Sequence, residues 1–256
     1  MVDHRHPERS AMPGTVGAPR RRARPGLTRD QILAAAIRLA DHTGTAGLTM
    51  RALAKDLGVE AMSLYHHIAS KDALLDAMVD HVFSEISLPE TGTGWRDGML
   101  QRAHSARATL RDHPWALGLM ASRSTPGPAT LRHHDAVLGC LRHNGFSLPL
   151  AARAVALLDS YIYGFVLQEN GLPFASAEEL ATIADGILAT PAIAEEYPHL
   201  TELITEHALK PGYAYSDEFD HGLDLILDGL ERQRLASEDR PASSPAPRGT
   251  PRPSAS

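Results

Sequence analysis

Apolar residues recur every three or four positions along most of the chain, a spacing that places them on one face of an α-helix. Between residues 28 and 44 these positions are Ile32, Leu33, Ala36, Ile37 and Ala40. The interior lacks the β-branched runs that are typical of strands. The pattern therefore predicts an all-α fold.

Two short helical patterns joined by a glycine form the most specific local feature. Thr49 precedes the first pattern, where its hydroxyl can cap a helix start, and Gly58 follows it, where a helix can end in the left-handed conformation. The second pattern begins near Glu60, runs through AMSLYHHI, and buries Leu64 and Ile68. Two short helices joined in this way predict a helix-turn-helix.

The second helix of the pair starts with small residues, which allow close approach to a DNA groove. Its exposed hydroxyl and imidazole groups, and the lysine that follows, can bond to phosphate oxygens or base edges. The residues predicted to contact double-stranded DNA are Arg51, Ala61, Met62, Ser63, Tyr65, His66, His67 and Lys71. A structural interpretation is also open, in which the pair are ordinary short helices of an all-α domain.

The neighbouring segments support the DNA-binding interpretation. Thr28 and Gln31 form a capping box at the start of the preceding helix, and Gly44 is expected to end it. Ser70 is expected to cap a longer helix that runs from Lys71 to about Ile86. Residues 27–71 are therefore predicted to form a three-helix DNA-binding domain, followed by a connecting helix.

Residues 42–78, HTGTAGLTMRALAKDLGVEAMSLYHHIASKDALLDAM, resemble the TetR family of bacterial repressors. This resemblance implies a ligand-responsive transcriptional repressor, which binds a palindromic operator as a homodimer and is released by a small-molecule effector. A different class remains as the alternative, namely an all-α enzyme or small-molecule binding protein in which the helix-turn-helix is structural. A third possibility is an architectural DNA-binding protein without an effector.

Charge distribution favours a nucleic-acid partner at one end of the chain only. The formal net charge is −6, yet between Arg20 and Lys71 nine Lys and Arg residues stand against four acidic residues. The remainder of the chain is therefore acidic. A basic head on an acidic body suits a protein whose head meets phosphates.

Both ends of the chain have the composition of disordered segments. Residues 1–26 are rich in Arg, Pro and Gly, and residues 236–256 are rich in Ser, Pro and Arg. The RRRAR run at 20–24 is either an arm that reaches DNA phosphates or the minor groove, or a solvated tail. The start lacks a signal-peptide core, and we identify no apolar stretch long enough to cross a membrane, so we expect a cytoplasmic protein without a membrane partner.

Residues 72–235 are predicted to contain the connecting helix and an α-helical ligand-binding and dimerisation domain. Two helices in it carry apolar seams of heptad spacing, and Ser216 is expected to cap the second. Periodicity alone fits either an intramolecular core or a subunit interface. The TetR resemblance implies that the seams form a four-helix bundle with a second copy, through Val155, Leu158, Ile162, Phe165, Phe219, Leu223, Ile226 and Leu230.

The body also resembles the C-terminal domain of the tetracycline-repressor subclass, through the stretches HNGFSL at 143–148 and YIYGFVLQ at 161–168. The resemblance implies an effector pocket beneath the central helices. The positions that would hold magnesium and tetracycline carry different residues, namely Ser87, Arg102, Ala106, Ala121, Thr125, Val137 and Gln168. We therefore expect an apolar, mostly neutral effector instead. The predicted lining is Phe83, Ile86, Trp95, Met99, Leu117 and Met120, with Arg102, His104 and Gln168 as polar groups, although each could equally be core.

Catalytic and metal chemistry find little support in the sequence. The chain has no nucleophile elbow and no glycine-rich phosphate loop. Among 14 histidines, the candidates for a metal site are His104, His113 and the adjacent pair His133 and His134. Adjacent helical residues point about 100° apart and chelate poorly. The single cysteine, Cys140, fits a small buried hydrophobe better than a redox switch. We therefore expect no metal, no cofactor and no enzymatic activity.

Overall fold

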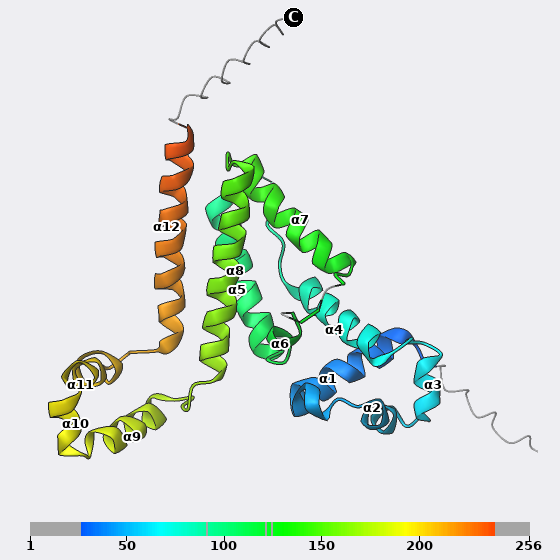
Figure 1. The fold of residues 1–256 in the computed structure, drawn as a ribbon, viewed down its shortest axis with the longest axis horizontal. Coiled ribbons are helices and arrows are strands. Elements are labelled where there is room, and N and C mark those ends of the chain that lie inside the picture. The colour runs from blue at the N-terminus through cyan, green and yellow to red at the C-terminus, as the bar shows by residue number, and fades with distance from the viewer. Residues whose placement is uncertain (1–26, 91, 121, 124, 239–256) are drawn as a thin grey trace, which may run out of the picture.

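The computed structural model describes residues 27–90, 92–120, 122–123 and 125–238, and every long element in this part of the chain is a helix (Figure 1). The predicted all-α fold class is confirmed. The predicted tail at 1–26, including the RRRAR run, lies outside the described residues. The second predicted tail was placed to begin at 236, but the last helix continues to Glu238, and residues 239–256 lie outside the described part.

Three helices form the head of the molecule, defined here as residues 27–70. They are α1 (Arg29–Gly47), α2 (Met50–Leu57) and α3 (Ala61–Tyr65). A fourth helix, α4 (Lys71–Glu85), leads from the head to the body. The predicted caps are present, because the side chains of Thr28, Thr49 and Ser70 each accept a hydrogen bond from the backbone three residues later.

Two glycines shape the head as predicted. Gly58 has φ 65° and ψ 35°, the left-handed conformation that a residue with a Cβ adopts less readily. Gly44 has φ 66° and ψ 176°, so regular α1 geometry stops there although helical hydrogen bonding resumes towards Gly47. Helix α2 packs against both α1 and α3, and Leu53 and Leu64 are buried in the core.

The body is built around two long helices that pack against each other, α5 (Trp95–Asp112) and α8 (Leu148–Asn170). A short helix, α6 (Ala116–Met120), follows α5, and α7 (Pro128–His143) packs against α4, α5 and α8. The last helix, α12 (Glu218–Glu238), runs beside α8 (Figure 1). One continuous set of buried residues connects the head, α4 and the body.

An arm between α8 and α12 was not anticipated from the sequence. It contains α9 (Ala177–Leu188), α10 (Pro191–Glu196), α11 (Pro198–Leu203) and a π-helical turn (Ile204–Ala208), and it extends away from the head (Figure 1). A 3-10 turn at Tyr215–Asp217 then leads into α12. Ser216 lies inside this turn and does not cap α12, so that prediction was wrong.

The expectation that no segment could span a membrane by length and composition was also wrong. Among the described residues, α8 is long and apolar enough to pass that test. The physical reason lies in its surroundings, because α8 packs against α5, α7 and α12. A helix covered on several sides needs apolar residues around most of its circumference. Its composition is therefore that of the central helix of this domain.

Candidate DNA-binding surface and ligand cavity

The predicted DNA-contacting residues gather on the outer side of α2, α3 and the start of α4. Met62 is 71% exposed and Tyr65 is 44% exposed, because Leu64 turns the opposite side of α3 into the core. Ala61 and Ser63 are half-buried at the start of the helix. Arg51, His66, His67 and Lys71 are exposed.

The end of α3, the second helix of the predicted helix-turn-helix and here called the recognition helix, differs from the prediction. Helix α3 ends at Tyr65, and His66 and His67 lie in the turn that follows. Backbone N–H groups of His67 and Ile68 donate to the Leu64 carbonyl at 3.0 Å and close that turn. Within the described residues, the side chains of Arg51, Tyr65 and Lys71 have no hydrogen-bond or ion-pair partner. They are free to bind an external group.

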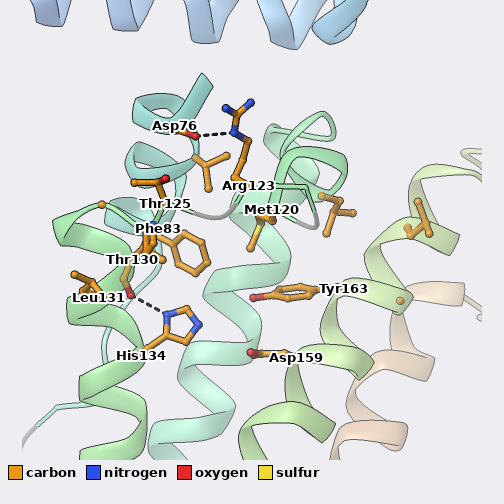
Figure 2. A pocket seen from close by; sticks show the side chains of 16 residues that line it. Asp76, Phe83, Met120, Arg123, Thr125, Thr130, Leu131, His134, Asp159 and Tyr163 are labelled. Atoms are coloured by element: carbon orange, nitrogen blue, oxygen red, sulfur yellow. Dashed lines mark hydrogen bonds and ion pairs between the residues drawn. The ribbon is translucent and has the colours of Figure 1, made fainter. Parts of the chain in front are cut away.

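A cavity of about 670 Å³ lies between α4, α6, α7 and α8 (Figure 2). Its walls are mainly apolar and include Phe83 of α4 and Met120 of α6. The complete lining is Asp76, Val79, Phe83, Leu117, Met120, Arg123, Thr125, Pro126, Gly127, Thr130, Leu131, His134, Asp159, Tyr163, Gly164 and Leu167. A volume of this size suits a drug-sized molecule.

Polar groups stand at two places in this cavity. At one end, Arg123 donates from Nε to Asp76 at 2.6 Å (Figure 2). Across the middle, His134 projects from α7 towards Tyr163 and Asp159, which project from α8 (Figure 2). The Nδ1 atom of His134 is 2.8 Å from the Thr130 carbonyl oxygen, an acceptor, so this nitrogen carries a proton and donates. A neutral His134 therefore has Nε2 as an acceptor.

Behind the cavity wall, a buried ionic cluster fixes Asp159. Arg102 is only 2% exposed, donates from Nη2 to Asp159, and donates from Nε to Nε2 of His133 at 3.1 Å. Burial lowers the pKa of His133 to about 3, and the charge of Arg102 acts in the same direction. Burial likewise raises the pKa of the Tyr163 phenol, with a further contribution from Asp159. His133 and Tyr163 are therefore neutral near pH 7.

Two donors of this cluster have no partner among the described atoms, namely Nη1 of Arg102 and Nδ1 of His133. His133 accepts through Nε2, so its proton must lie on Nδ1. Buried donors of this kind are normally satisfied by an ordered water or a bound molecule.

The predicted effector-binding residues separate into two groups. Phe83, Leu117 and Met120 line the cavity. The other six do not: Ile86 and Met99 are core residues, and Trp95 packs on Phe146 and donates to Glu231. His104 pairs with Asp220, Gln168 accepts from Tyr215, and Arg102 lies in the ionic cluster. Periodicity identified buried positions, but it could not distinguish cavity walls from solid core.

The predicted dimerisation seams need a similar correction. Leu158, Ile162 and Phe165 of α8, and Phe219, Leu223 and Leu230 of α12, are buried within a single chain. Val155 and Ile226 are half-buried. The seams face each other between α8 and α12 of one subunit, because heptad spacing suits any helix pair that packs at a small angle.

Several cavity residues escaped the sequence analysis, namely Arg123, Thr130, Asp159 and Tyr163. Asp159 could have been identified from the sequence, because it is the only carboxylate in the apolar run from 148 to 168. For His134, the sequence suggests only a candidate metal ligand. Among the described residues, no group of three or more His, Cys, Asp or Glu side chains is arranged to hold a metal ion.

Comparison with known proteins covers both parts of the chain. A family model described as bacterial regulatory proteins, tetR family, matches residues 32–78. A second, described as tetracyclin repressor-like, C-terminal domain, matches residues 88–234.

Two relatives and one solved structure illustrate the similarity. An HTH-type transcriptional regulator of Saccharopolyspora erythraea is 35% identical over 82% of this chain and 86% of its own length. The HTH-type transcriptional repressor DrrR1 of Streptomyces coeruleorubidus is 33% identical over 89% of this chain and 85% of its length. The crystal structure of ActR from Streptomyces coelicolor in complex with actinorhodin has a TM-score of 0.67 and 26% identity, and covers 84% of this chain and 100% of ActR.

Proposed function

Because this chain belongs to the tetR family of bacterial regulatory proteins, we propose that α3 reads its operator and that the cavity between α4, α6, α7 and α8 binds the effector that releases it. Ligand-responsive repression by a DNA-binding homodimer is the function of this family. Such a regulator acts on DNA in the bacterial cytoplasm, where we expect this protein. A role in regulation also accounts for the lack of recognisable catalytic motifs.

One observation carries this proposal: a single helix serves both sites. Helix α4 begins at Lys71, just after the recognition helix, and its residues Asp76, Val79 and Phe83 line the cavity. A ligand that displaces Phe83 would therefore move the same rigid element that supports α3. A two-state lever of this kind can couple binding sites that do not touch.

The release mechanism follows from the spacing of two half-sites. A dimer reads successive major grooves only when its recognition helices are separated by about 34–36 Å, one turn of DNA. Tilting α4 changes that separation. The ligand can cause release only to the extent that it binds the DNA-incompetent state more tightly.

The contacts to DNA divide by chemistry. We assign Arg51, Tyr65 and Lys71 to phosphate oxygens, because they are exposed and have no partner within the described residues. Replacing Lys71 should weaken binding to all sequences and reduce the salt slope by about one unit. The remaining predicted residues, Ala61, Met62, Ser63, His66 and His67, are assigned to base edges and the groove floor.

The cavity favours an apolar molecule that carries hydrogen-bond donors. Its walls are mostly apolar, and two acceptors project into it, namely the Asp159 carboxylate and, when the His134 ring is neutral, its Nε2 atom. The Tyr163 hydroxyl can donate or accept beside them. Arg102 offsets the charge of Asp159, so a neutral hydroxyl suits this wall as well as a cation does.

A second copy of the chain is the natural occupant of the outer face of α8 and α12. Leu157 and Leu225 are 47% and 60% exposed on these helices, and Leu167 and Leu235 are also exposed. Ala156 and Ser160 on the same side of α8 are small enough for close helix approach. We therefore place the dimer interface on this face and not on the buried seams. The arm adds exposed apolar residues, including Leu200 and Leu203.

The decisive experiment is a reciprocity measurement. Operator affinity is measured by gel shift on DNA upstream of the gene, with and without a ligand identified by thermal shift. An effector must weaken operator binding by the same factor by which the operator weakens effector binding. Loss of DNA binding in Tyr65→Ala and Lys71→Ala, with an unchanged melting temperature, supports the interface. A ligand whose affinity ignores the operator would exclude release through this cavity.

A further inference from the structure

Asp41, near the end of α1, joins the head to the body. Its Oδ1 atom accepts a hydrogen bond from Nε1 of Trp115 at 2.6 Å and lies 2.7 Å from Nδ1 of His113. Within the described residues, these are the only side-chain hydrogen bonds that connect the head to any residue beyond α4. Besides the covalent link and apolar packing through α4, Asp41 therefore provides the side-chain hydrogen bonds between the head and the body.

The imidazole of His113 lies between two carboxylates. Its Nδ1 atom faces Asp41, and its Nε2 atom is 3.1 Å from Oε2 of Glu85. Ionised carboxylates only accept hydrogen bonds, and a neutral imidazole has a single N–H donor. Both contacts are hydrogen bonds only when both ring nitrogens carry protons. We call this arrangement of Asp41, His113 and Glu85 the head clamp.

The surroundings of His113 favour the charged form. Burial of the ring lowers the pKa of His113, but the hydrogen bonds and charges of Asp41 and Glu85 outweigh burial and raise it above the ordinary value. Behind Glu85, on the same helix, His81 lies 3.0 Å from Oε1. From the turn just before α6, the Trp115 ring packs against the imidazole. The preceding residues of α5, Arg111 and Asp112, are exposed.

The clamp residues lie close in sequence to residues that line the cavity. Helix α6 begins directly after Trp115, and its residues Leu117 and Met120 line the cavity. On α4, Glu85 follows the lining residue Phe83 closely in sequence. A displacement of the cavity walls would therefore also displace Trp115 and Glu85, which both contact His113.

We propose that Asp41, His113 and Glu85 are positioning residues, which hold the head at a fixed angle to the body and make operator binding depend on the protonation of His113. This inference rests on the proposed function. Loss of the proton removes the central charge and one of the two hydrogen bonds. The head then gains freedom relative to α4 and α6, and the two heads of a dimer are no longer held at half-site spacing. The proton thus acts as an effector beside the small molecule.

The sign of the pH dependence follows from the raised pKa. The clamp contributes fully at pH values below about 6.5, the ordinary histidine value. Its contribution is lost as the pH rises through the higher pKa of the folded state. Operator binding should therefore weaken on the alkaline side.

The first test needs no DNA. Nitrogen-15 NMR of the full chain, with His113 assigned by comparison with His113→Gln, reports whether both ring nitrogens are protonated. We expect the ring to be mostly imidazolium at about pH 6.5, the ordinary histidine value, and the titration midpoint to fall in Asp41→Asn, in which the negative charge is removed. A mostly neutral imidazole at that pH would overturn the clamp.

The second test measures operator affinity by fluorescence anisotropy on a duplex from the chain's own upstream region, between about pH 6 and pH 8.5. We expect the wild type to lose about five-fold in affinity across this range, the lower end of usual couplings. His113→Gln should bind weakly at both ends with a flatter profile. Any effect of pH on the DNA-contacting surface itself is common to both proteins and cancels in the comparison.

The matched control is His143→Gln, because His143 is exposed on α7 and bonds only to the backbone of Gly139 among described residues. It should keep the wild-type profile. If His113→Gln fails to fold, Asp41→Asn replaces it, since the amide oxygen can still accept from Trp115. Identical profiles for wild type and a folded clamp variant would overturn the proposal. If no duplex binds at any pH, the proposed function fails, and the NMR titration still decides whether the clamp exists.

Discussion

The Arg123 guanidinium donates from Nε to Oδ1 of Asp76 at 2.6 Å, and this pair closes one end of the cavity. The same guanidinium lies 3.2 Å from Oδ1 of Asp72, in the first turn of α4. One side chain therefore contacts both the ligand space and the turn beside the recognition helix. Binding of a ligand in the cavity can therefore act on the start of α4 through Arg123.

Replacing Arg123 with Gln should reduce the response of operator binding to ligand while it leaves the stability of the fold nearly unchanged. The ion pairs are screened by solvent, so we expect little change in the free energy of unfolding. The factor by which a ligand weakens operator binding should fall several-fold, because one link to α4 is lost. Arg132→Gln is the matched control, since Arg132 is exposed on α7 and has no partner within the described residues. Equal coupling in both variants would remove Arg123 from the mechanism.

The depressed pKa of His133 predicts acid sensitivity. Its folded pKa is about 3. The unfolded chain takes up a proton near pH 6.5 and the folded protein does not, so stability should fall by about 2 kcal/mol between pH 6.5 and pH 5 from this group. Urea unfolding of wild type and His133→Asn at both pH values checks this. The variant should lose less stability on acidification, and parallel losses would contradict a neutral buried His133.

Gly164 offers a way to fill the cavity. A Cβ at this position would meet no atom within 4 Å, and the residue lines the cavity. Gly164→Leu should therefore raise helix stability by about 0.5–1 kcal/mol while occupying ligand space. Operator binding should persist and ligand response should disappear. Gel shift measures operator binding and thermal shift measures ligand binding. A variant that still responds to ligand would show that the effector binds elsewhere.

Two glycines of α12 should respond oppositely to alanine. A Cβ on Gly222 would lie 2.2 Å from the Tyr161 hydroxyl oxygen, which donates to backbone carbonyls at the start of α12. Gly222→Ala should therefore cost about 1–3 kcal/mol through overpacking. A Cβ on Gly229 would only approach Arg232 at 3.8 Å. Gly229→Ala should stabilise by up to about 1 kcal/mol, and chemical denaturation of the pair measures both signs.

The position of the dimer interface can be tested with glutamate substitutions. Leu225→Glu places a charge on the exposed face of α12, so we expect folded monomers by light scattering with native helicity. Leu223→Glu buries a charge within one chain and should unfold the body, because Leu223 is fully buried. A folded monomer for Leu223→Glu and an intact dimer for Leu225→Glu would show that the interface is formed by the predicted seam instead.

Local structure followed from local chemistry. Thr28, Thr49 and Ser70 cap helices because a hydroxyl at these positions satisfies free N–H groups whatever the fold. Gly58 ends α2 because the turn requires a left-handed conformation. These determinants lie within a few residues of each other, and the head could therefore be predicted almost completely. The short α3 was the exception, since nothing local distinguishes His66 in a helix from His66 in a turn.

Tertiary structure decided what the buried positions do. The spacing of Leu158, Ile162 and Leu223 identified a buried seam, but only the packing of α8 on α12 assigned it to one chain. The same applies to Trp95 and Met99, which were correctly expected to be buried and do not line the cavity. Periodicity reports the side of a helix that avoids water, and it carries no information about the neighbour that covers it.

The polar groups depended most on the fold. Arg102 and Asp159, or Asp41 and His113, are far apart in sequence and carry no shared motif. Their interaction exists because α5 packs on α8, and because the α5–α6 turn reaches the end of α1. The sequence by itself determined an all-α regulator with a helix-turn-helix head, since caps, turns and periodicity act over short distances. The cavity, the ionic cluster and the head clamp arose only when distant helices met, because charge pairing acts through space and not along the chain.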